Sequence, residues 1–506
     1  MTYAAVLGFL ASSWIVYQWV TFTISTRKVR DIPTVGPDGF ISSYLSAWKY
    51  EFGNGKQMIQ EGYEKYPGSV FKVPTLSSPN RWMIVVNGSR LIEDLRKASK
   101  EQLSFGDAFF ELFQSDHLMH GPGKSVNRRD TAEYHIGVVR GPLTRGYPFR
   151  FEDIKDEISQ SFSDLIPVTE SWSPVKIHDV IIHIICRTTN RLFVGLPLCR
   201  DPDYCRIQET ITVHLVTAGT FLALLPAAFR PVVGRLITRF PSTIKKVQDC
   251  ITPLAEEIIK SKAAWEGKNG NLLSWLWEEA PEKCKTLSDL AGRLIMVNIA
   301  SLHTTTQVVT DTLLELAARQ EYVAPLRSEV EYAIDELGWT KEAMSKMHKL
   351  DSFIKETCRL KGLMPITVVR NARVDYRLSN GAVIPAGFRV SASASPLHTD
   401  PMVYENAESF DGYRFAGSQE DGSSNGHSQL VSLDSNYLLF GHGRAACPGR
   451  FFAVSEIKAM MAHVLLNYDF KLPNDETRAP EADWFGHHRV PNQTAEIMFR
   501  KRQSIH

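Results

Sequence analysis

The chain has 506 residues, with 57 Lys and Arg against 56 Asp and Glu, a formal net charge of +1, and 43% hydrophobic residues. Because a phosphate-binding surface normally appears as an excess or a cluster of basic residues, this balance argues against a nucleic-acid partner. The length is sufficient to bury a large core.

The N-terminus has the pattern of a membrane anchor. The first 26 residues carry no charge, and residues 3–24 form a mostly apolar run of 22 residues, long enough as a helix to cross a bilayer. A cleaved signal peptide is not favoured, because a basic start and a clear cleavage site are missing; a buried core helix is the other alternative. Arg27, Lys28 and Arg30 follow, so the positive-inside rule predicts a single-pass anchor with the rest of the chain in the cytosol.

This pattern divides the chain into an anchor (residues 1–26), a basic and proline-rich linker (27–37) and a catalytic domain (38–506). The seven cysteines form an odd set without CxxC or Cys/His zinc spacing, which suits a domain in the reducing cytosol rather than a disulfide framework. Within the domain, long helical patterns alternate with short strand-like runs such as residues 82–86. The sequence therefore predicts a mainly α fold with a minor β-sheet.

Three segments of the domain have a distinct character. Residues 288–320 form the longest proline-free helical pattern, which predicts a helix across the whole domain. Residues 416–429, rich in Gly, Ser and Asn, predict an exposed loop. Residues 213–237 are apolar but broken by Pro226 and Pro231, so contact with a membrane surface and burial in the core both stay open for them.

The most informative segment is 440–453, Phe-Gly-His-Gly-Arg-Ala-Ala-Cys-Pro-Gly-Arg-Phe-Phe-Ala. Its glycines allow the backbone to approach a flat ligand closely, and Pro448 suits the first turn of a helix that runs through Phe452 to about Leu466. Cys447 would then lie at a helix N-terminus, which favours the thiolate, the form that binds a metal. For an isolated cysteine the alternative is a small buried side chain.

This segment resembles the heme-binding loop of the cytochrome P-450 superfamily, Phe-x-x-Gly-x-Arg-x-Cys-x-Gly. Phe440, Gly443, Cys447 and Gly449 fall in register, whereas Ala445 stands where the basic residue that contacts a heme propionate is usual. Whether the adjacent Arg444 supplies this contact stays open. The resemblance implies the cytochrome P-450 fold, preceded by the transmembrane helix, and a heme whose iron takes Cys447 as its axial thiolate ligand.

Other segments resemble this superfamily in the same order along the chain. Glu356-x-x-Arg359 matches its Glu-x-x-Arg pair, and Arg414 in residues 410–415 matches the arginine that joins it, although Gly412 stands where proline is common. The resemblance implies a three-residue ionic network behind the heme.

Two further segments resemble the ligands of the heme propionates. Arg370 ends a strand-like run, 365–370, that would line the pocket, and residues 384–387 resemble the hairpin turn that follows. Tyr134-His135 with Arg140 resembles the helix that supplies the other propionate partner, with the usual tryptophan absent. Arg370, His135 and Arg140 are therefore implied heme contacts.

On the long helix, residues 300–305 (Ala-Ser-Leu-His-Thr-Thr) resemble the oxygen-activation groove, in which small residues at 300 and 301 let the helix bulge. Thr304, followed by Thr305, would relay protons. His303 stands where an acid is usual, and a histidine can also pass protons because its unperturbed pKa lies close to neutral. A buried histidine beside threonines that cap helix carbonyls is the alternative.

The resemblance implies a monooxygenase that oxidises an apolar small molecule with dioxygen, with electrons from an NADPH-cytochrome P-450 reductase at the endoplasmic reticulum membrane. The His-Thr-Thr groove and Arg450 to Ala453 look like fungal members that oxidise terpenoids in secondary metabolism. The pocket candidates are Phe105, Phe109, Phe110, Ile299, Ile366, Val368 and Phe485, the last within residues 484–491, which resemble the final pocket turn. A heme-thiolate isomerase or dehydratase without a reductase, and a heme-binding protein without turnover, are the alternatives.

Overall fold

The computed structural model describes residues 3–121, 133–167, 169–261, 270–417, 428–485 and 488–503. Helices dominate it, and short strands make up four small sheets. The helices are α1 (Tyr3–Lys28), α2 (Phe40–Lys49), α3 (Gly55–Lys65), α4 (Ser89–Lys97), α5 (Phe105–Leu112), α6 (Ser115–Leu118), α7 (Tyr134–Val138), α8 (Thr144–Gly146), α9 (Phe151–Leu165), α10 (Ile177–Phe193), α11 (Pro202–Leu224), α12 (Arg230–Ile237), α13 (Phe240–Lys260), α14 (Leu272–Glu279), α15 (Leu287–Ala318), α16 (Val323–Leu337), α17 (Lys341–Lys346), α18 (His348–Lys361), α19 (Ser395–His398) and α21 (Arg450–Asn467).

The main sheet has five strands in the order β1-β2-β8-β5-β3, of which β2 and β8 run parallel and the other neighbours antiparallel. A second sheet joins β4, β12 and β9, and two pairs stand alone, β6 with β7 and β10 with β11. The strands are β1 (Val70–Pro74), β2 (Trp82–Val86), β3 (Leu103–Ser104), β4 (Ser173–Lys176), β5 (Ile366–Ala372), β6 (Tyr376–Arg377), β7 (Val383–Ile384), β8 (Arg389–Ser393), β9 (Tyr468–Lys471), β10 (Asp483–Phe485), β11 (His488–Val490) and β12 (Glu496–Lys501).

Residues 384–387 do not form the predicted hairpin turn. The amide of Phe388 donates to the carbonyl of Pro385, and Gly387 takes φ +84°, so a tight turn is present. This turn leads from β7, which pairs with β6, into β8 of the five-stranded sheet. The prediction of a hairpin was therefore wrong, because the turn changes sheets.

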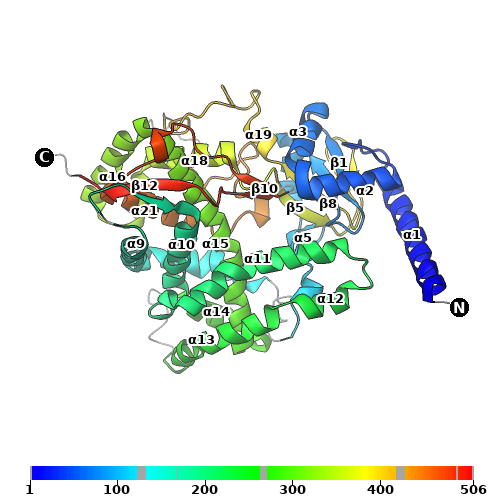
Figure 1. The fold of residues 1–506 in the computed structure, drawn as a ribbon, viewed down its shortest axis with the longest axis horizontal. Helices are drawn as coiled ribbons and strands as arrows, with labels where there is room; N and C mark the ends of the chain where they lie inside the picture. The colour runs from blue at the N-terminus through cyan, green and yellow to red at the C-terminus, as the bar shows by residue number, and fades with distance from the viewer. Residues whose placement is uncertain are drawn as a thin grey trace.

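The helix α15 is the centre of the helical part of the molecule (Figure 1). It spans 32 residues, and Thr286 caps its start by accepting a hydrogen bond from the amide of Asp289. It packs against α10, α11, α13, α18 and α21. The predicted central helix is confirmed, with each end shifted by one or two residues.

The helix α1 projects from the edge of the molecule beside α2 (Figure 1). Most of its described large apolar side chains are exposed, among them Phe9 (69%), Val16 (58%) and Trp19 (54%), whereas Phe22 near its end packs against Phe40 and Trp82. The side chains of residues 3–7, 10 and 11 lie outside the described part, so this segment is established as a helix and not as a membrane span. Among the described residues, one helix is long and apolar enough to cross a membrane, α11, and a third of its apolar window is buried.

Residues 213–237 comprise the second half of α11 and all of α12. The helix α11 buries Leu215 and Leu222, whereas Val213 is exposed on it and Leu236 on α12, the latter at 78%. The segment therefore has a core face and an apolar outer face. Of the predicted loop at 416–429, residues 418–427 lie outside the described part.

Candidate functional site

The loop that carries Cys447 folds back on itself. The amide of Cys447 donates to the carbonyl of Phe440 at 2.9 Å, and Gly441 and Gly443 take φ values of +68° and +74°. A Cβ on Gly443 would lie 2.8 Å from Cγ of Arg96 and 2.9 Å from its carbonyl oxygen. Only glycine therefore allows the loop to pack directly on the end of α4.

The helix that follows begins later than the sequence predicts. The helix α21 starts at Arg450, with Gly449 as its N-cap, so Pro448 lies before the helix and the prediction that it occupies the first turn was wrong. The reason is that Gly449, at ψ 3°, has not yet entered helical geometry. Cys447 still lies close enough for its sulfur to accept hydrogen bonds from the amides of Gly449 and Arg450.

Two opposing effects act on this thiol. Burial raises the pKa of Cys447, while the amides of Gly449 and Arg450 and the charge of the Arg450 guanidinium lower it. Burial prevails in the net pKa shift, while the amide donors act toward the thiolate, in the direction that the sequence predicts. A coordinated metal ion deprotonates its thiol ligand outright, and the amides and the guanidinium would then stabilise the charge that remains.

A contact that the sequence motifs did not indicate fixes this loop from the side. Nε2 of His442, in the loop, lies 2.7 Å from Oε1 of Glu93 on α4, and Glu93 also accepts a hydrogen bond from Arg96. His442 and Glu93 lie 349 positions apart in the sequence, so no local sequence pattern could have predicted their contact.

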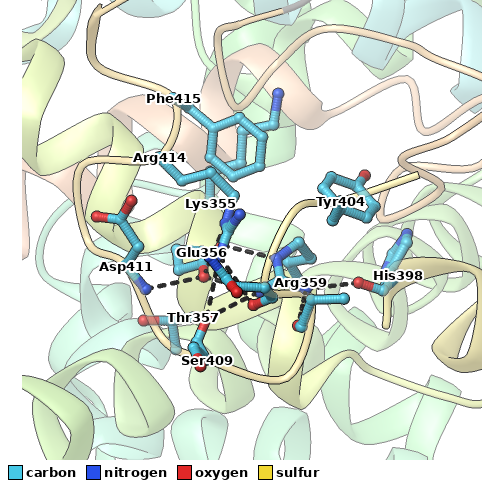
Figure 2. A network of polar contacts seen from close by, with 12 residues as sticks. Lys355, Glu356, Thr357, Arg359, His398, Tyr404, Ser409, Asp411, Arg414 and Phe415 are labelled. Carbon is cyan, nitrogen blue, oxygen red and sulfur yellow. Dashed lines mark hydrogen bonds and ion pairs between the residues drawn. The ribbon is translucent and has the colours of Figure 1, made fainter. Parts of the chain in front are cut away.

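The structure brings Glu356, Arg359 and Arg414 together, as Figure 2 shows. Both Glu356 and Arg359 have fully buried side chains, with Nε to Oε2 at 2.7 Å and Nη2 to Oε1 at 2.8 Å. Arg414 donates from Nε to both oxygens of Glu356 at 3.1 Å. One carboxylate therefore serves two guanidinium groups, an arrangement that satisfies buried charge.

The network extends to backbone groups of distant segments. Nη1 of Arg359 donates to the carbonyls of His398 and Ala407, each at 2.6 Å, and Glu356 accepts from the amide of Asp411 at 3.0 Å. In turn, Nε2 of His398 accepts from the amide of Leu438, just before the Cys447 loop, at 2.9 Å. The network thus connects α18 to the loop through His398, a residue that the sequence did not single out.

The glycine at position 412, where the superfamily often has proline, has a structural reason. A Cβ there would lie 2.6 Å from the ring of Tyr322 and 2.8 Å from the ring of Phe353. The Gly412 amide also donates to the hydroxyl of Tyr322 at 3.2 Å. Proline could provide neither the space nor the donor, so Gly412 and these two rings form a matched set.

Arg370 lies in β5, next to a β-bulge. The register of β5 shifts between Thr367 and Arg370, and Val368 takes φ +54°, a strained value for a β-branched residue. Arg370 is 6% exposed, burial lowers its pKa to about 10, and Nη1 donates to the carbonyl of Val369. Its guanidinium pairs with no carboxylate of the described residues, so a buried anionic group would suit it.

The other predicted propionate contacts lie on different elements. Arg140, in the π-helical stretch Val139–Leu143 that continues α7, is exposed and donates from Nη2 to the carbonyl of Arg444 at 3.1 Å. His135 is half-buried, with Nδ1 3.3 Å from Nη1 of Arg293. Arg444 is exposed, and the contact with Arg140 uses the backbone carbonyl of Arg444. This contact therefore does not show that the Arg444 side chain replaces the basic residue that is absent at Ala445.

The groove residues interrupt the burial of α15. From Asp289 to Ala318 every side chain is buried except Ala300, Ser301, His303 and Thr304. Thr304 is exposed, and its hydroxyl donates to the carbonyl of Ala300 at 2.9 Å, whereas Thr305 is buried. Exposed side chains in the middle of a core helix indicate an internal cavity. The helix is α-helical throughout, so the bulge that the sequence predicts at positions 300 and 301 is not present.

His303 does not share the orientation of Thr304. Its Nε2 lies 3.1 Å from the carbonyl oxygen of Glu209 on α11, and burial lowers the pKa of the ring. The structure thus places Thr304 toward the cavity and ties His303 to a neighbouring helix.

The pocket candidates are spread over several elements. Ile299, Ile366 and Val368 are buried in three different apolar clusters, Phe109 is partly buried, and Phe105 is exposed at 42%. Phe110 is half-buried on α5, and the side chain of Phe485 lies outside the described part.

These residues fit a heme: a half-buried cysteine thiol with amide donors, glycines that allow close backbone approach, and a buried guanidinium for a propionate. The family model for cytochrome P-450 matches residues 42–496. The chain belongs to the cytochrome P-450 family.

Its relatives cover nearly the whole chain. Cytochrome P-450 monooxygenase 71 of Postia placenta is 39% identical over 507 residues, which cover 99% of this chain and 98% of that protein. Cytochrome P-450 monooxygenase janQ of Penicillium janthinellum is 30% identical over 517 residues, 99% of each chain. A third, CYP512U6 of Ganoderma lucidum, is 31% identical over 463 residues, 90% and 89% of the two chains. The protein is a cytochrome P-450 monooxygenase with a mainly helical fold, and its cofactor is heme held through a cysteine thiolate.

Proposed function

We propose that Cys447 is the axial ligand and that the protein oxidises an apolar small molecule, most specifically a terpenoid of fungal secondary metabolism. The observation that carries the ligand assignment is the Cys447 loop, where Gly443 packs on α4 and where two amides and the Arg450 guanidinium surround the half-buried sulfur. The terpenoid class is supported by the resemblance of the His303-Thr304-Thr305 groove and of Arg450 to Ala453 to fungal members with such substrates.

The buried Arg370 guanidinium would bind a heme propionate and so orient the ring, with His135 and Arg140 as the candidates for the second propionate. Glu356, Arg359 and Arg414 tie α18 to the segment that carries Arg414, and this network would lie behind the heme. When bound, heme with a thiolate ligand supplies the activation of dioxygen that oxidises C–H bonds.

The protein has to deliver protons to the cavity during the reaction, and Thr304 is the residue placed for this step. The Thr304 hydroxyl rests on carbonyls of its own helix, 2.9 Å from Ala300 and 3.3 Å from Ser301, and faces the cavity. A rotation about the Cβ–Oγ1 bond turns the hydroxyl hydrogen from these carbonyls toward the cavity, and a proton passed on from the hydroxyl would be replaced from water that reaches the exposed side chain. Thr304 is therefore the proposed proton relay, and the neighbouring Thr305, which is buried, is not placed for this role.

The proposed electron donor is an NADPH-cytochrome P-450 reductase. Cytochrome P-450 monooxygenases generally use a redox partner, and Arg140 and Arg444 are exposed beside the Cys447 loop, with Arg450 half-buried next to them. This cationic surface suits a protein with an acidic face.

The proposed location is the endoplasmic reticulum membrane, with residues 1–26 as anchor, 27–37 as linker and 38–506 in the cytosol. Support comes from α1, which exposes most of its described large apolar side chains, and from the apolar outer face of α12. Full-length protein should resist alkaline carbonate extraction from membranes, and a variant without residues 1–28 should be released at least in part.

The test of the central proposal is the absorption spectrum of dithionite-reduced protein with carbon monoxide. Wild type should show the long-wavelength Soret band of a heme-thiolate protein, and Cys447→Ser should lose it. Cys250→Ser, a change at another half-buried cysteine, is the control and should keep the band.

A wild type that folds without this band would contradict the proposal, as would a Cys447→Ser variant that keeps it. The substrate class is then tested with NADPH, a reductase and a panel of terpenoids and other apolar molecules. Oxidised products from the other molecules alone would overturn the terpenoid assignment.

A further inference from the structure

Three helices meet at the groove through polar side chains. His303 of α15 reaches the carbonyl oxygen of Glu209 on α11 at 3.1 Å. The Glu209 carboxylate lies 2.7 Å from Nδ1 of His183 on α10. Glu209 therefore contacts α15 through its backbone and α10 through its side chain.

The chemistry of the first contact fixes the proton on His303. A backbone carbonyl can only accept a hydrogen bond, so Nε2 of His303 must carry the hydrogen. That nitrogen is then occupied by α11. The ring position where the superfamily usually has an acid is used here as a tie between two helices.

A second set of hydrogen bonds connects α11 to α15 through Asn190 of α10. The hydroxyl of Tyr204 on α11 donates to Oδ1 of Asn190 at 2.8 Å, and Nδ2 of Asn190 donates to Oδ1 of Asn298 on α15 at 2.9 Å. Tyr204 and Glu209 are five residues apart, and so are Asn298 and His303. Residues 298–303 of α15 are therefore held at both ends, directly to α11 at His303 and through Asn190 of α10 at Asn298.

The segment between the two ties holds the groove. Ala300 and Ser301 lie inside it, and their carbonyls are the acceptors of the Thr304 hydroxyl. The second half of α11 has no comparable tie to α15 in the described part, and Val213 and Phe221 are exposed on it. Any displacement of α11 is thus transmitted to the carbonyls that hold Thr304.

We propose that His303 is a positioning residue that couples the placement of α11 to the geometry of the oxygen groove, rather than a proton donor. The proposal deepens the proposed function, because its consequence for catalysis rests on Thr304 as relay. The tie itself can be tested without turnover.

Hydrogen exchange of the full-length, heme-loaded protein measures the tie directly. His303→Phe keeps a ring and removes the donor, so exchange should rise about three- to tenfold in residues 205–212 and 299–304, the factor expected for losing one hydrogen bond. His303→Gln places an N–H near the same position and should restore slow exchange. Glu209→Gln keeps the backbone carbonyl and should leave residues 299–304 unchanged.

The second readout is the recombination of carbon monoxide after flash photolysis. Its rate should change in His303→Phe and return toward wild type in His303→Gln, because carbon monoxide enters the groove that the tie shapes. Unchanged exchange in His303→Phe, or a failure of His303→Gln to restore it, would overturn the proposal. If His303→Phe does not accumulate, His303→Leu serves the same comparison.

The outcomes separate this proposal from the proposed function. Absence of the long-wavelength Soret band from the wild-type protein would contradict the ligand assignment and would leave the hydrogen-exchange comparison unaffected. Normal exchange in His303→Phe with an intact band would contradict the tie alone.

Discussion

The two sides of α15 are held by different forces. On the side of α18, Glu356, Arg359 and Arg414 form a buried ionic network with distances of 2.7 to 3.1 Å. In the groove, Thr304 is exposed and its hydroxyl donates to carbonyls of its own helix.

The comparison shows that the ionic network stabilises the fold, whereas Thr304 contributes little to stability. Removing one member of a buried charge network leaves the others without compensation, which is costly. An exposed hydroxyl that bonds to its own helix contributes little to folding, so the groove is free to serve the reaction. The following substitutions test this contrast, from the largest expected loss of stability to the smallest.

Glu356→Gln should have the largest effect, because it leaves the buried guanidinium of Arg359 and the half-buried guanidinium of Arg414 without their carboxylate. Loss of one partner of a buried pair costs about 3–5 kcal/mol, and we expect this loss in chemical denaturation, together with poor accumulation of heme-loaded protein. The control is Glu481→Gln, which breaks the exposed pair of Arg478 and Glu481 at the same i,i+3 spacing and should cost less than about 1 kcal/mol. Equal effects of the two variants would contradict the contrast.

Gly412→Ala should cost about 1–3 kcal/mol, because its Cβ would meet the rings of Tyr322 and Phe353. The measurement is again the free energy of unfolding from denaturation. Gly417→Ala, where nothing lies within 4 Å of the added Cβ, is the matched control and should be nearly neutral. A neutral Gly412→Ala would show that the two rings move aside easily.

His398 should make stability depend on pH. Burial lowers its pKa from 6.5 to about 3, so the unfolded chain binds a proton that the folded protein does not. The stabilisation is complete above about pH 6.5 and is lost as the pH falls toward 3, at up to about 1.4 kcal/mol per pH unit.

His398→Gln should flatten this dependence between pH 6.5 and 4, as measured by unfolding midpoints across that range. His463, whose pKa burial lowers to about 4, remains in the variant, so part of the slope should persist. An unchanged slope would mean that His398 is protonated in the folded protein.

Thr304→Val should change stability least, by less than about 1 kcal/mol, and yet reduce product formed per NADPH by at least about tenfold, as expected for loss of a proton relay. The control is Thr306→Val: the Thr306 hydroxyl bonds to the carbonyl of Leu302 at 2.7 Å in the same way but is buried away from the cavity. Product loss in both variants would remove Thr304 from its proposed role.

Local patterns were enough to predict much of this protein. The apolar run of α15 predicted the central helix within two residues, because burial on all sides leaves a long proline-free pattern. The spacing of Glu356 and Arg359 places both on one face of a helix, so their ion pair depends on three positions of sequence.

Contacts between distant segments could not be predicted in this way. By sequence, Gly412 departs from the proline that is common in the family, and only the structure shows that the rings of Tyr322 and Phe353 leave no room for a Cβ there. Likewise, glycine is required at position 443 because Arg96 of α4 packs against it. The start of α21 was missed because Gly449 can either continue or cap a helix, and only its backbone angles decide.

The sequence by itself thus determined the family resemblance, the central helix and the residues of the ionic network, since these depend on patterns within a few positions. The tertiary structure alone decided that His303 is tied to α11 and that His442 is held by Glu93. The physical reason is that a side chain's hydrogen-bond partner is set by which helices pack beside it, and that packing brings together residues 94 and 349 positions apart.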